Sequence, residues 1–439
     1  MSEDLKSANK NDIIIIGSGP TGLLSATLSL KLTPKRKIYL VENRPDATRT
    51  IMMWIDHEFL KYIDSSILDK INKQDAMCIS NKITPIPCEN TLDKYISNIN
   101  EETRVQLNLL EIEWRKWLIT QGIEFIVIDK NKPLTKEDFK DIKCENILMA
   151  DGVSSTTSRN FFQIKHKLLI SYAIVITFTC NLKENNYTQS DYNNLLLNQN
   201  SVVTYFSKPI IDNKSNGYIG LQVSYETYEK LKKYKGHELI NNLKKEKEGI
   251  IYSNIEYKLY ENIEPEYTGI FPINIQTATH FYTKIDNKNF FILGDAAYST
   301  HFFSGLGMNR GMAAALKLYE LMDSNNENIG ELYNIFQKNN RNTLWKDIIP
   351  QYLYPISETL DKCKEDIDCI YNESIKDNDI RTAYNKKMYE LTTNLLYSDE
   401  ENIELKFVKY QQKYLKYIFF KKYLFYKQKY LKLKLMSKR

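Results

Sequence analysis

The apolar positions near the N-terminus follow two different periods in succession. Asp12–Ile16 is a short run of isoleucines after one acid, which predicts a buried strand of a parallel sheet. The apolar spacing of Leu23–Leu32 is helical, and Lys37–Val41 predicts a second strand. The order strand, helix, strand predicts a βαβ unit.

The middle of the chain has a different pattern, in which short strand-like segments dominate. Asn185–Asn200 is polar and predicts a loop, two helical stretches are expected at about 226–235 and 237–247, and helices with charged faces are expected from Tyr319 to about Leu405. The expected strands are Leu169–Phe178, Ser201–Phe206, Gly217–Ser224 and Tyr267–Ile275.

A glycine-rich turn, Gly17-Ser-Gly-Pro-Thr-Gly22, joins the first strand to the first helix. Gly17 permits the tight turn, Gly19 lets the backbone approach a pyrophosphate, and Gly22 lets helix and strand pack closely. Pro20 and Thr21 lie at the helix N-terminus, whose free N–H groups and partial positive charge attract phosphates. A glycine turn without a ligand is the alternative interpretation.

Glu42 ends the second strand, 20 residues beyond Gly22, where a nucleotide-binding βαβ unit carries a carboxylate for the ribose hydroxyls. This acid would repel a 2′-phosphate, which disfavours NADP at this site. Asn43 and Arg44 follow it and are counted with it as candidate cofactor contacts. The sequence therefore predicts a dinucleotide site.

A second motif, Ile292–Tyr298 followed by Gly305–Gly311, places a strand end at Gly294-Asp295 and a helix start near Gly307, running to Leu321. The segment resembles the second FAD motif of class A flavin monooxygenases, the family that includes para-hydroxybenzoate hydroxylase. The resemblance implies that Asp295 holds the ribityl hydroxyls and that the helix N-terminus faces the flavin pyrimidine edge, where reduced flavin carries negative charge. The residues that the resemblance assigns to FAD here are Gly294, Asp295, Gly305, Gly307, Met308 and Asn309.

A third motif, Leu148–Ser155, contains Asp151 and Gly152 and resembles the Asp-Gly signature that serves FAD and nicotinamide binding in the same family. The family's arginine falls at Ser158, whereas this chain has Arg159 one residue later. Either the shifted arginine serves, or nicotinamide handling is altered.

Two weaker resemblances concern the segments before this motif. Arg104, before Leu107–Leu110, is the candidate for a helix arginine that contacts the cofactor in relatives, and an ordinary solvated arginine is the alternative. Arg49–Trp54, with a helix expected to about Ile71, also resembles the family and is loosely similar to the monooxygenase domain of the actin-oxidising MICAL proteins.

The chain departs from the family beside the expected flavin. Tyr298 stands at the family's histidine, and His301-Phe302 stands at its proline pair. Since that segment lines the reactive face in relatives, His301 is the candidate catalytic residue, as a proton donor or substrate contact. A structural hydrogen bond is the alternative role, and His57 is a weaker candidate.

The resemblance implies an α/β fold (α+β overall) built from a Rossmann-type FAD-binding domain, an inserted β-sheet substrate domain and C-terminal helices. The flavin would lie at the seam between the two domains. The expected boundaries are 1–165 and 285–330 for the FAD-binding domain, 166–284 for the substrate domain, 331–405 for the helical region and 406–439 for a basic tail.

Charge separates the tail from the rest. The formal net charge is +5, but residues 406–439 contain twelve Lys or Arg and no acid, which leaves −7 on residues 1–405. The tail predicts a basic amphipathic helix and resembles Tyr-Leu-Lys segments of giant DNA virus proteins. It would pack on its own protein, or make weak contact with an anionic membrane surface or nucleic acid. No DNA partner is expected for the body.

The location expected from sequence is a soluble, cytoplasmic protein, in host cytoplasm or a virion if the protein is viral. Met1–Lys10 is unlike a signal peptide, and the apolar stretch Leu168–Cys180 is too short to span a bilayer. The six cysteines include no CxxC pair, so no metal site is expected and free thiols are favoured over a bridge between Cys363 and Cys369.

These features favour an FAD-dependent monooxygenase that uses NADH or NADPH and O2 to hydroxylate a small-molecule substrate of unidentified structure, for which an aromatic ring is one option. An FAD-dependent dehydrogenase or reductase on the same fold is the first alternative, and the missing proline pair favours it. A non-catalytic flavin-binding scaffold is the second. A flavin halogenase is disfavoured because the chain has no WxWxIP-type motif, only Trp114–Trp117, which predicts helix.

Overall fold

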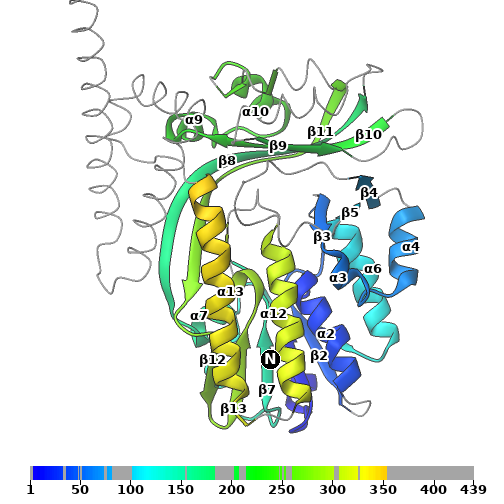
Figure 1. Ribbon diagram of the computed structural model, residues 1–439, viewed down its shortest axis with the longest axis vertical. Coiled ribbons are helices and arrows are strands. Elements are labelled where there is room, and N and C mark those ends of the chain that lie inside the picture. The colour runs from blue at the N-terminus through cyan, green and yellow to red at the C-terminus, as the bar shows by residue number, and fades with distance from the viewer. Residues whose placement is uncertain are drawn as a thin grey trace, which may run out of the picture. The chain divides into compact units, whose positions relative to one another are not determined.

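A six-stranded sheet organises the computed structural model (Figure 1). Its strand order is β12-β13-β7-β1-β2-β6, in which β12 is antiparallel to β13 and all other neighbours are parallel. The central strand β1 is buried at all four positions, as its isoleucine run predicted. The strand bounds are β1 Ile13–Ile16, β2 Ile38–Glu42, β6 Glu124–Val127, β7 Asn146–Met149, β12 Tyr282–Ile285 and β13 Lys288–Ile292.

The structure describes part of the chain. The described residues are 3–32, 36–47, 49, 52–73, 77–81, 101–153, 156–182, 202–206, 214–246, 248–249, 252–253, 260–300, 306–324 and 327–352. The predicted loop 185–200, the segment 301–305 and the tail 406–439 lie outside them. Residues up to 348 form one compact unit, and a second unit begins at 349, of which only the end of one helix is described.

Helix α2, Pro20–Leu32, connects β1 to β2 and confirms the predicted βαβ unit. It is buried along most of its length although it carries several hydroxyls. Three of them, Ser25, Thr27 and Ser29, donate to backbone carbonyls four residues earlier, so burial leaves these groups hydrogen-bonded. The buried Trp114 of helix α6, Leu107–Thr120, donates its indole N–H to Thr27 at 2.9 Å and joins the two helices.

An antiparallel sheet with the order β11-β8-β10-β9 contains the four strands predicted in the middle of the chain. Two of them are much longer than predicted: β8 and β11 have 19 residues each and pair along most of that length. Register shifts in the β8–β11 ladder accompany the curvature visible in Figure 1. The bounds are β8 Ile164–Leu182, β9 Val202–Phe206, β10 Lys214–Val223 and β11 Tyr260–Ala278, with helices α9 Tyr225–Leu231 and α10 Gly236–Leu243.

A small sheet with the order β3-β5-β4 precedes α6. The single helix predicted up to Ile71 is wrong, because the structure has two helices with a turn between them. Asp64 accepts hydrogen bonds from the backbone N–H of Ser66, at 2.9 Å, and from its hydroxyl, which starts the second helix. The bounds are β3 Met52–Ile55, β4 Met77–Asn81, β5 Glu101–Gln106, α3 His57–Leu60 and α4 Ser65–Lys73.

Two C-terminal helices complete the described residues. Helix α12, Leu306–Asp323, packs beside α2, and α13, Ile329–Tyr352, is fixed to the end of β13. Tyr333 of α13 donates to the Ile292 carbonyl at 3.0 Å, and Gln337 donates to the Tyr333 hydroxyl at 2.7 Å. Shorter elements are α1 Glu3–Lys6, η1 Lys136–Phe139, α7 Thr157–Phe161 and η3 Gly294–Ala296.

This architecture confirms the predicted fold class, an α/β fold with a parallel Rossmann-type sheet, a separate antiparallel sheet and following helices. From β1 the chain continues to β2, which pairs with β1 on one side. Strand β7 pairs with β1 on the other side, so the strand order reverses at β1. Ligands of open α/β sheets bind beyond the carboxyl ends of the strands at such a point. In the described ranges, no helix combines the length and apolar character needed to cross a membrane.

Candidate functional site

Two glycines of the turn after β1 are required by close packing. Gly17 has a φ of 101°, and a Cβ there would lie inside 3.0 Å of backbone atoms of Ala150 and Asp151. A Cβ on Gly22 would overlap the Gly17 carbonyl oxygen. These positions therefore hold β1, β7 and the start of α2 together.

Gly19 differs from both, because the protein leaves room beside it. The nearest atoms to a Cβ at this position would be Nη2 of Arg49 and Oε1 of Glu111, each at 3.8 Å, an ordinary contact distance. Gly19 immediately precedes α2, so the space lies at a helix N-terminus. A glycine with free space beside it at such an end fits the close approach of an anionic ligand.

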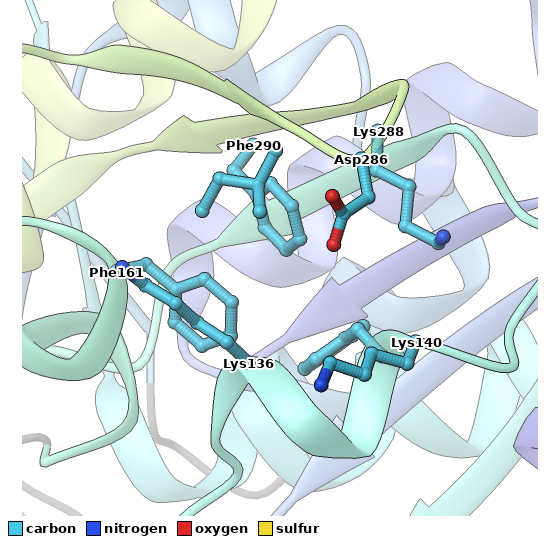
Figure 2. Close-up of a pocket in the computed structure, with 8 residues that line it drawn as sticks. Lys136, Lys140, Phe161, Asp286, Lys288 and Phe290 are labelled. Atoms are coloured by element: carbon cyan, nitrogen blue, oxygen red, sulfur yellow. The ribbon is translucent and has the colours of Figure 1, made fainter.

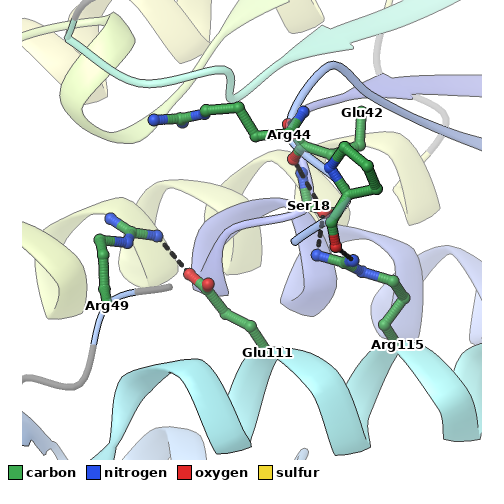
Figure 3. Close-up of polar contacts among 7 residues, drawn as sticks. Ser18, Glu42, Arg44, Arg49, Glu111 and Arg115 are labelled. Atoms are coloured by element: carbon green, nitrogen blue, oxygen red, sulfur yellow. Dashed lines mark hydrogen bonds and ion pairs between the residues drawn. The ribbon is translucent and has the colours of Figure 1, made fainter. Parts of the chain in front are cut away.

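Arg49 and Glu111 form an ion pair next to this space (Figure 3). The Arg49 carbonyl accepts from the N–H of Asn108, 2.9 Å away in the first turn of α6, which fixes the arginine near the acid. The Arg49 side chain is 50% exposed and that of Glu111 only 5%. Desolvation raises the pKa of Glu111, although Arg49 and then Arg115 favour its charged form.

Glu42 ends β2 as predicted, and its carboxylate accepts four hydrogen bonds from the protein. Ser18 donates its N–H at 2.7 Å and its hydroxyl at 2.8 Å, while the N–H groups of Asn43 and Arg44 donate at 2.9 and 2.8 Å. A carboxylate has about four acceptor positions. Binding a ribose hydroxyl therefore requires one of these bonds to be exchanged, and the Ser18 hydroxyl is a movable donor.

Arg115 of α6 contacts this hydrogen-bonded group through Ser18. It is buried, donates to the Ser18 hydroxyl at 2.8 Å and to the Pro45 carbonyl, and lies 4.9 Å from the centre of the Phe125 ring. Figure 3 shows Arg115 reaching Ser18 from α6, on the same helix that carries Glu111. The first turn of the Rossmann unit is thus fixed from α6 by charged groups.

The second predicted motif meets the first at Thr21. Gly294, with a φ of 60°, lies so close that a Cβ there would be 3.0 Å from the Thr21 hydroxyl. A Cβ on Gly311 of α12 would lie even nearer to the same hydroxyl and 3.0 Å from the Cα of Gly294. The structure therefore brings η3, α12 and the start of α2 together.

Asp295 lies between these elements. Its side chain is exposed, yet desolvation by the surrounding protein raises its pKa, and the nearby Arg49 opposes that shift. A Cβ on Gly307, at the start of α12, would be 3.2 Å from Oδ1 of Asp295. Asp295 thus lies near the N-terminus of α12 and within the electrostatic reach of Arg49, which is the arginine beside Gly19.

Asn309 holds the neighbouring strand in place. It is buried, accepts from the N–H of Asp56 at 2.9 Å and donates to the carbonyl of Trp54 at 3.2 Å. Met308 beside it is partly exposed. The side-chain amide of Asn309 therefore connects the end of β3 to α12 through two hydrogen bonds.

The Asp-Gly motif has an unexpected hydrogen bond. Ser158, at the position of the family's arginine, donates its hydroxyl to Asp151, and its N–H donates to the same carboxylate at 3.2 Å. Arg159 is exposed and donates to the Val153 carbonyl at 3.0 Å. Gly152 has a φ of 83°. In this structure Asp151 caps the start of α7.

Several of the remaining candidates are not described by the structure. His301 and Gly305 are outside the described residues. Arg104 is in β5, opposite Trp54, three residues before α6 begins, and its side chain is not among those described. Tyr298 is buried, its hydroxyl has no hydrogen-bond partner in the described part of the chain, and burial raises its pKa. His57 is an exposed residue at the start of α3.

Four residues of this site were missed from sequence: Ser18, Arg49, Glu111 and Arg115. One available signal was the pair Glu111 and Arg115, spaced by four on a predicted helix whose inward positions are mostly apolar. Arg49 opens the stretch that resembles the family, but its pairing with Glu111 depends on contacts between distant segments.

A pocket at the other edge of the sheet is separate from this site (Figure 2). Three phenylalanines form its base, with Phe161 and Phe290 stacked at 4.7 Å, and lysines surround them. It lies beside the β12–β13 hairpin, where Asp286 and Asn287 both have positive φ, at the amino end of β13. Among the described residues no group of three or more His, Cys, Asp or Glu could hold a metal ion.

The fold is that of FAD-binding Rossmann-type flavin monooxygenases and halogenases. It is similar to flavin-dependent brominase Bmp2, with 12% identity, 86% of this chain and 93% of that chain covered, and a TM-score of 0.57. It is also similar to PqsL of Pseudomonas aeruginosa in complex with 2-aminobenzoylacetate, with 14% identity, 86% and 99% coverage and a TM-score of 0.53.

The anhydrotetracycline hydroxylase OxyS of Streptomyces rimosus gives 14% identity, coverage of 92% of this chain and 76% of that chain, and a TM-score of 0.51. No protein-family model matches the chain, and no curated protein matches it in sequence. At these identities the similarity concerns the fold.

Proposed function

We propose that this protein is an FAD-dependent monooxygenase that uses NADH or NADPH and O2 to hydroxylate a small molecule, for which an aromatic compound is one option. One observation carries the proposal. The guanidinium of Arg49 lies beside Gly19 at the α2 N-terminus and acts on the carboxyl group of Asp295, which in turn lies beside the N-terminus of α12. This arrangement occurs on a fold shared with flavin-dependent enzymes.

The described residues fit FAD at this place. The diphosphate would lie beside Gly19, where an added Cβ meets its nearest neighbours only at ordinary contact distance, and the α2 N-terminus with Arg49 would supply positive charge for it. Asp295 supplies acceptors for the ribityl hydroxyls, and Glu42 supplies a carboxylate near the ribose once the Ser18 hydroxyl turns away. Gly17, Gly22, Gly294 and Gly311 support the site by packing rather than by contact.

Bound FAD would supply the redox chemistry, taking electrons from the nicotinamide and activating dioxygen. The protein's own contribution at the flavin is electrostatic, because the α12 N-terminus near Gly307 would stabilise negative charge on the pyrimidine edge. We assign His301 the role of proton donor or substrate contact. The reductant is proposed to dock transiently, with Asp151 held by Ser158 rather than by an arginine.

The domain assignment is part of the proposal. Residues 1–165 and 285–330 would bind FAD, 166–284 would cover the substrate, 331–405 would be helical, and 406–439 would form a helix that packs on the protein. Weak contact of this tail with an anionic membrane surface or nucleic acid is the alternative. PqsL with 2-aminobenzoylacetate and a hydroxylase of anhydrotetracycline support a small-molecule substrate.

A first experiment is anaerobic titration of the purified full chain with NADH and NADPH, following the flavin absorbance. Bleaching is the expected result, and aerobic turnover with a substrate panel would then yield a hydroxylated product. Reduction without product would favour a dehydrogenase or reductase, and a yellow protein that no donor reduces would favour a scaffold. A brominated product would instead favour a halogenase.

A matched pair of variants tests the location of the site. Asp295→Asn should lower FAD affinity, because a neutral amide is a weaker acceptor for ribityl hydroxyls than a carboxylate. Asp286→Asn changes an acid in the hairpin turn at the separate pocket and should bind FAD as the parent does. Equal loss in both variants, or in neither, would contradict the assignment of Asp295.

A further inference from the structure

Glu111 places an acidic group where the proposed cofactor brings negative charge. Its Oε1 lies 3.8 Å from the position that a Cβ on Gly19 would take, and Nη2 of Arg49 lies at the same distance. Any phosphate that occupies the space beside Gly19 therefore approaches an arginine and a glutamate together. The glutamate already holds the arginine in an ion pair.

The surroundings of Glu111 make its charge costly. Its side chain is 5% exposed, and desolvation is the largest influence on its pKa, which lies above the ordinary value of 4.5. Arg49 and Arg115 stabilise the carboxylate, whereas Glu42 destabilises it. A ligand that draws Arg49 away removes the nearest stabilising charge and adds a repelling one.

Other described charges close to α6 are engaged elsewhere. Lys70 of α4 and Lys116 of α6 both pair with Glu113, at 3.5 and 2.6 Å. Helix α2 has no acid in its first turn and presents its N-terminus. Among the described side chains, Arg49, Arg115 and Glu42 are therefore the charges with the largest influence on Glu111.

We propose that Glu111 couples cofactor binding to proton uptake: it holds Arg49 in the free protein, and it takes one proton from solution when the FAD diphosphate binds Arg49. This inference rests on the proposed function, since it needs a diphosphate at Gly19. Protonated Glu111 is neutral and leaves Arg49 free to pair with a phosphate. It also retains an O–H that donates to the ligand or to the backbone.

The sign of the pH dependence follows from linkage. The bound state takes up a proton, so affinity rises as pH falls between the pKa of Glu111 in the complex and its lower pKa in the free protein. Within that window the dissociation constant falls up to tenfold per pH unit. Below the window Glu111 is protonated in both states and the dependence disappears.

The test measures FAD binding to the full apo chain between pH 5 and 9, by titration calorimetry and flavin fluorescence. Protonation of the adenine and isoalloxazine rings affects all variants equally, so its effect on the dissociation constant cancels when variants are compared. Glu111→Gln should bind FAD more tightly than the parent at the high end of the range and lose the pH slope. Glu111→Asp should keep a slope.

Glu113→Gln is the matched control, an acid two residues away on the same helix that pairs with lysines. It should keep the parent slope, and calorimetry in buffers of different ionisation enthalpy should detect proton uptake for it and for the parent. ADP, which carries the diphosphate without flavin, should show the same difference between parent and Glu111→Gln.

The outcomes separate this inference from the proposed function. FAD binding to the parent without proton uptake, or a slope that Glu111→Gln retains, overturns the role of Glu111 and leaves the cofactor site standing. A parent that binds neither FAD nor ADP overturns the proposed function and the inference with it. Circular dichroism on each variant establishes that altered binding is not loss of folding.

Discussion

Replacing Gly19 or Gly22 by alanine should separate binding from packing in the same turn. At Gly19 the added methyl lies 3.8 Å from its nearest neighbours, and the backbone is not in the left-handed region. Alanine should therefore leave stability unchanged, or raise it by about 0.4–1 kcal/mol through a less flexible unfolded chain. At Gly22 the methyl would overlap a backbone carbonyl, which cannot move aside as a flexible side chain does.

Gly22→Ala is expected to lower stability, whereas Gly19→Ala is expected to weaken FAD binding. Overpacking of this kind costs about 3 kcal/mol or more, which exceeds the gain of about 1 kcal/mol from alanine in a helix. Gly19→Ala should instead displace the diphosphate from the α2 N-terminus. Losing one charge-assisted hydrogen bond there costs about 1.5–3 kcal/mol, so FAD should bind roughly ten- to a hundredfold more weakly.

Thermal melting of the apo protein and FAD titration measure the two effects independently. The expected pattern is a Gly19→Ala protein that melts like the parent and binds FAD weakly, and a Gly22→Ala protein that melts at lower temperature. A Gly19→Ala protein with parental FAD affinity would refute the position assigned to the diphosphate. A Gly22→Ala protein of unchanged stability would refute the packing argument.

Three further changes test other parts of the structure. Asn309→Ala removes two hydrogen bonds that hold the end of β3 and should cost about 1–3 kcal/mol in chemical denaturation. Ser158→Ala removes the hydroxyl that bonds Asp151 and should lower the melting temperature, whereas alanine at the exposed Arg159 should not. Burial raises the pKa of Cys144 to about 12, so the thiolate that reacts with Ellman's reagent is nearly absent at pH 8. Parent and Cys144→Ala should then show equal thiol counts when native and differ by one when unfolded.

Local patterns in the sequence were enough for the elements that carry the first motif. The isoleucine run predicted β1, the glycine spacing predicted the turn, and Glu42 was placed at the end of β2. Strand formation and turn geometry at these places depend on residues close in sequence, which is why spacing alone predicts them. The same is true of α12, which begins at Leu306 inside the second glycine motif, one residue from the expected start near Gly307.

Other features depended on contacts between distant segments. The lengths of β8 and β11 come from their pairing with each other. The hydrogen bond from Ser158 to Asp151 needed the position of α7, which the motif spacing did not specify. Propensity and periodicity carry no information about such contacts.

The sequence by itself predicted the βαβ unit, which the structure confirms, and a second motif that resembles a flavin site. Only the tertiary structure decided that Arg49 and Glu111 flank Gly19 and that Thr21 touches both Gly294 and Gly311. The reason is physical: motif residues are specified by local backbone geometry, whereas the charges around them are brought together by the packing of α6, α12 and the sheet.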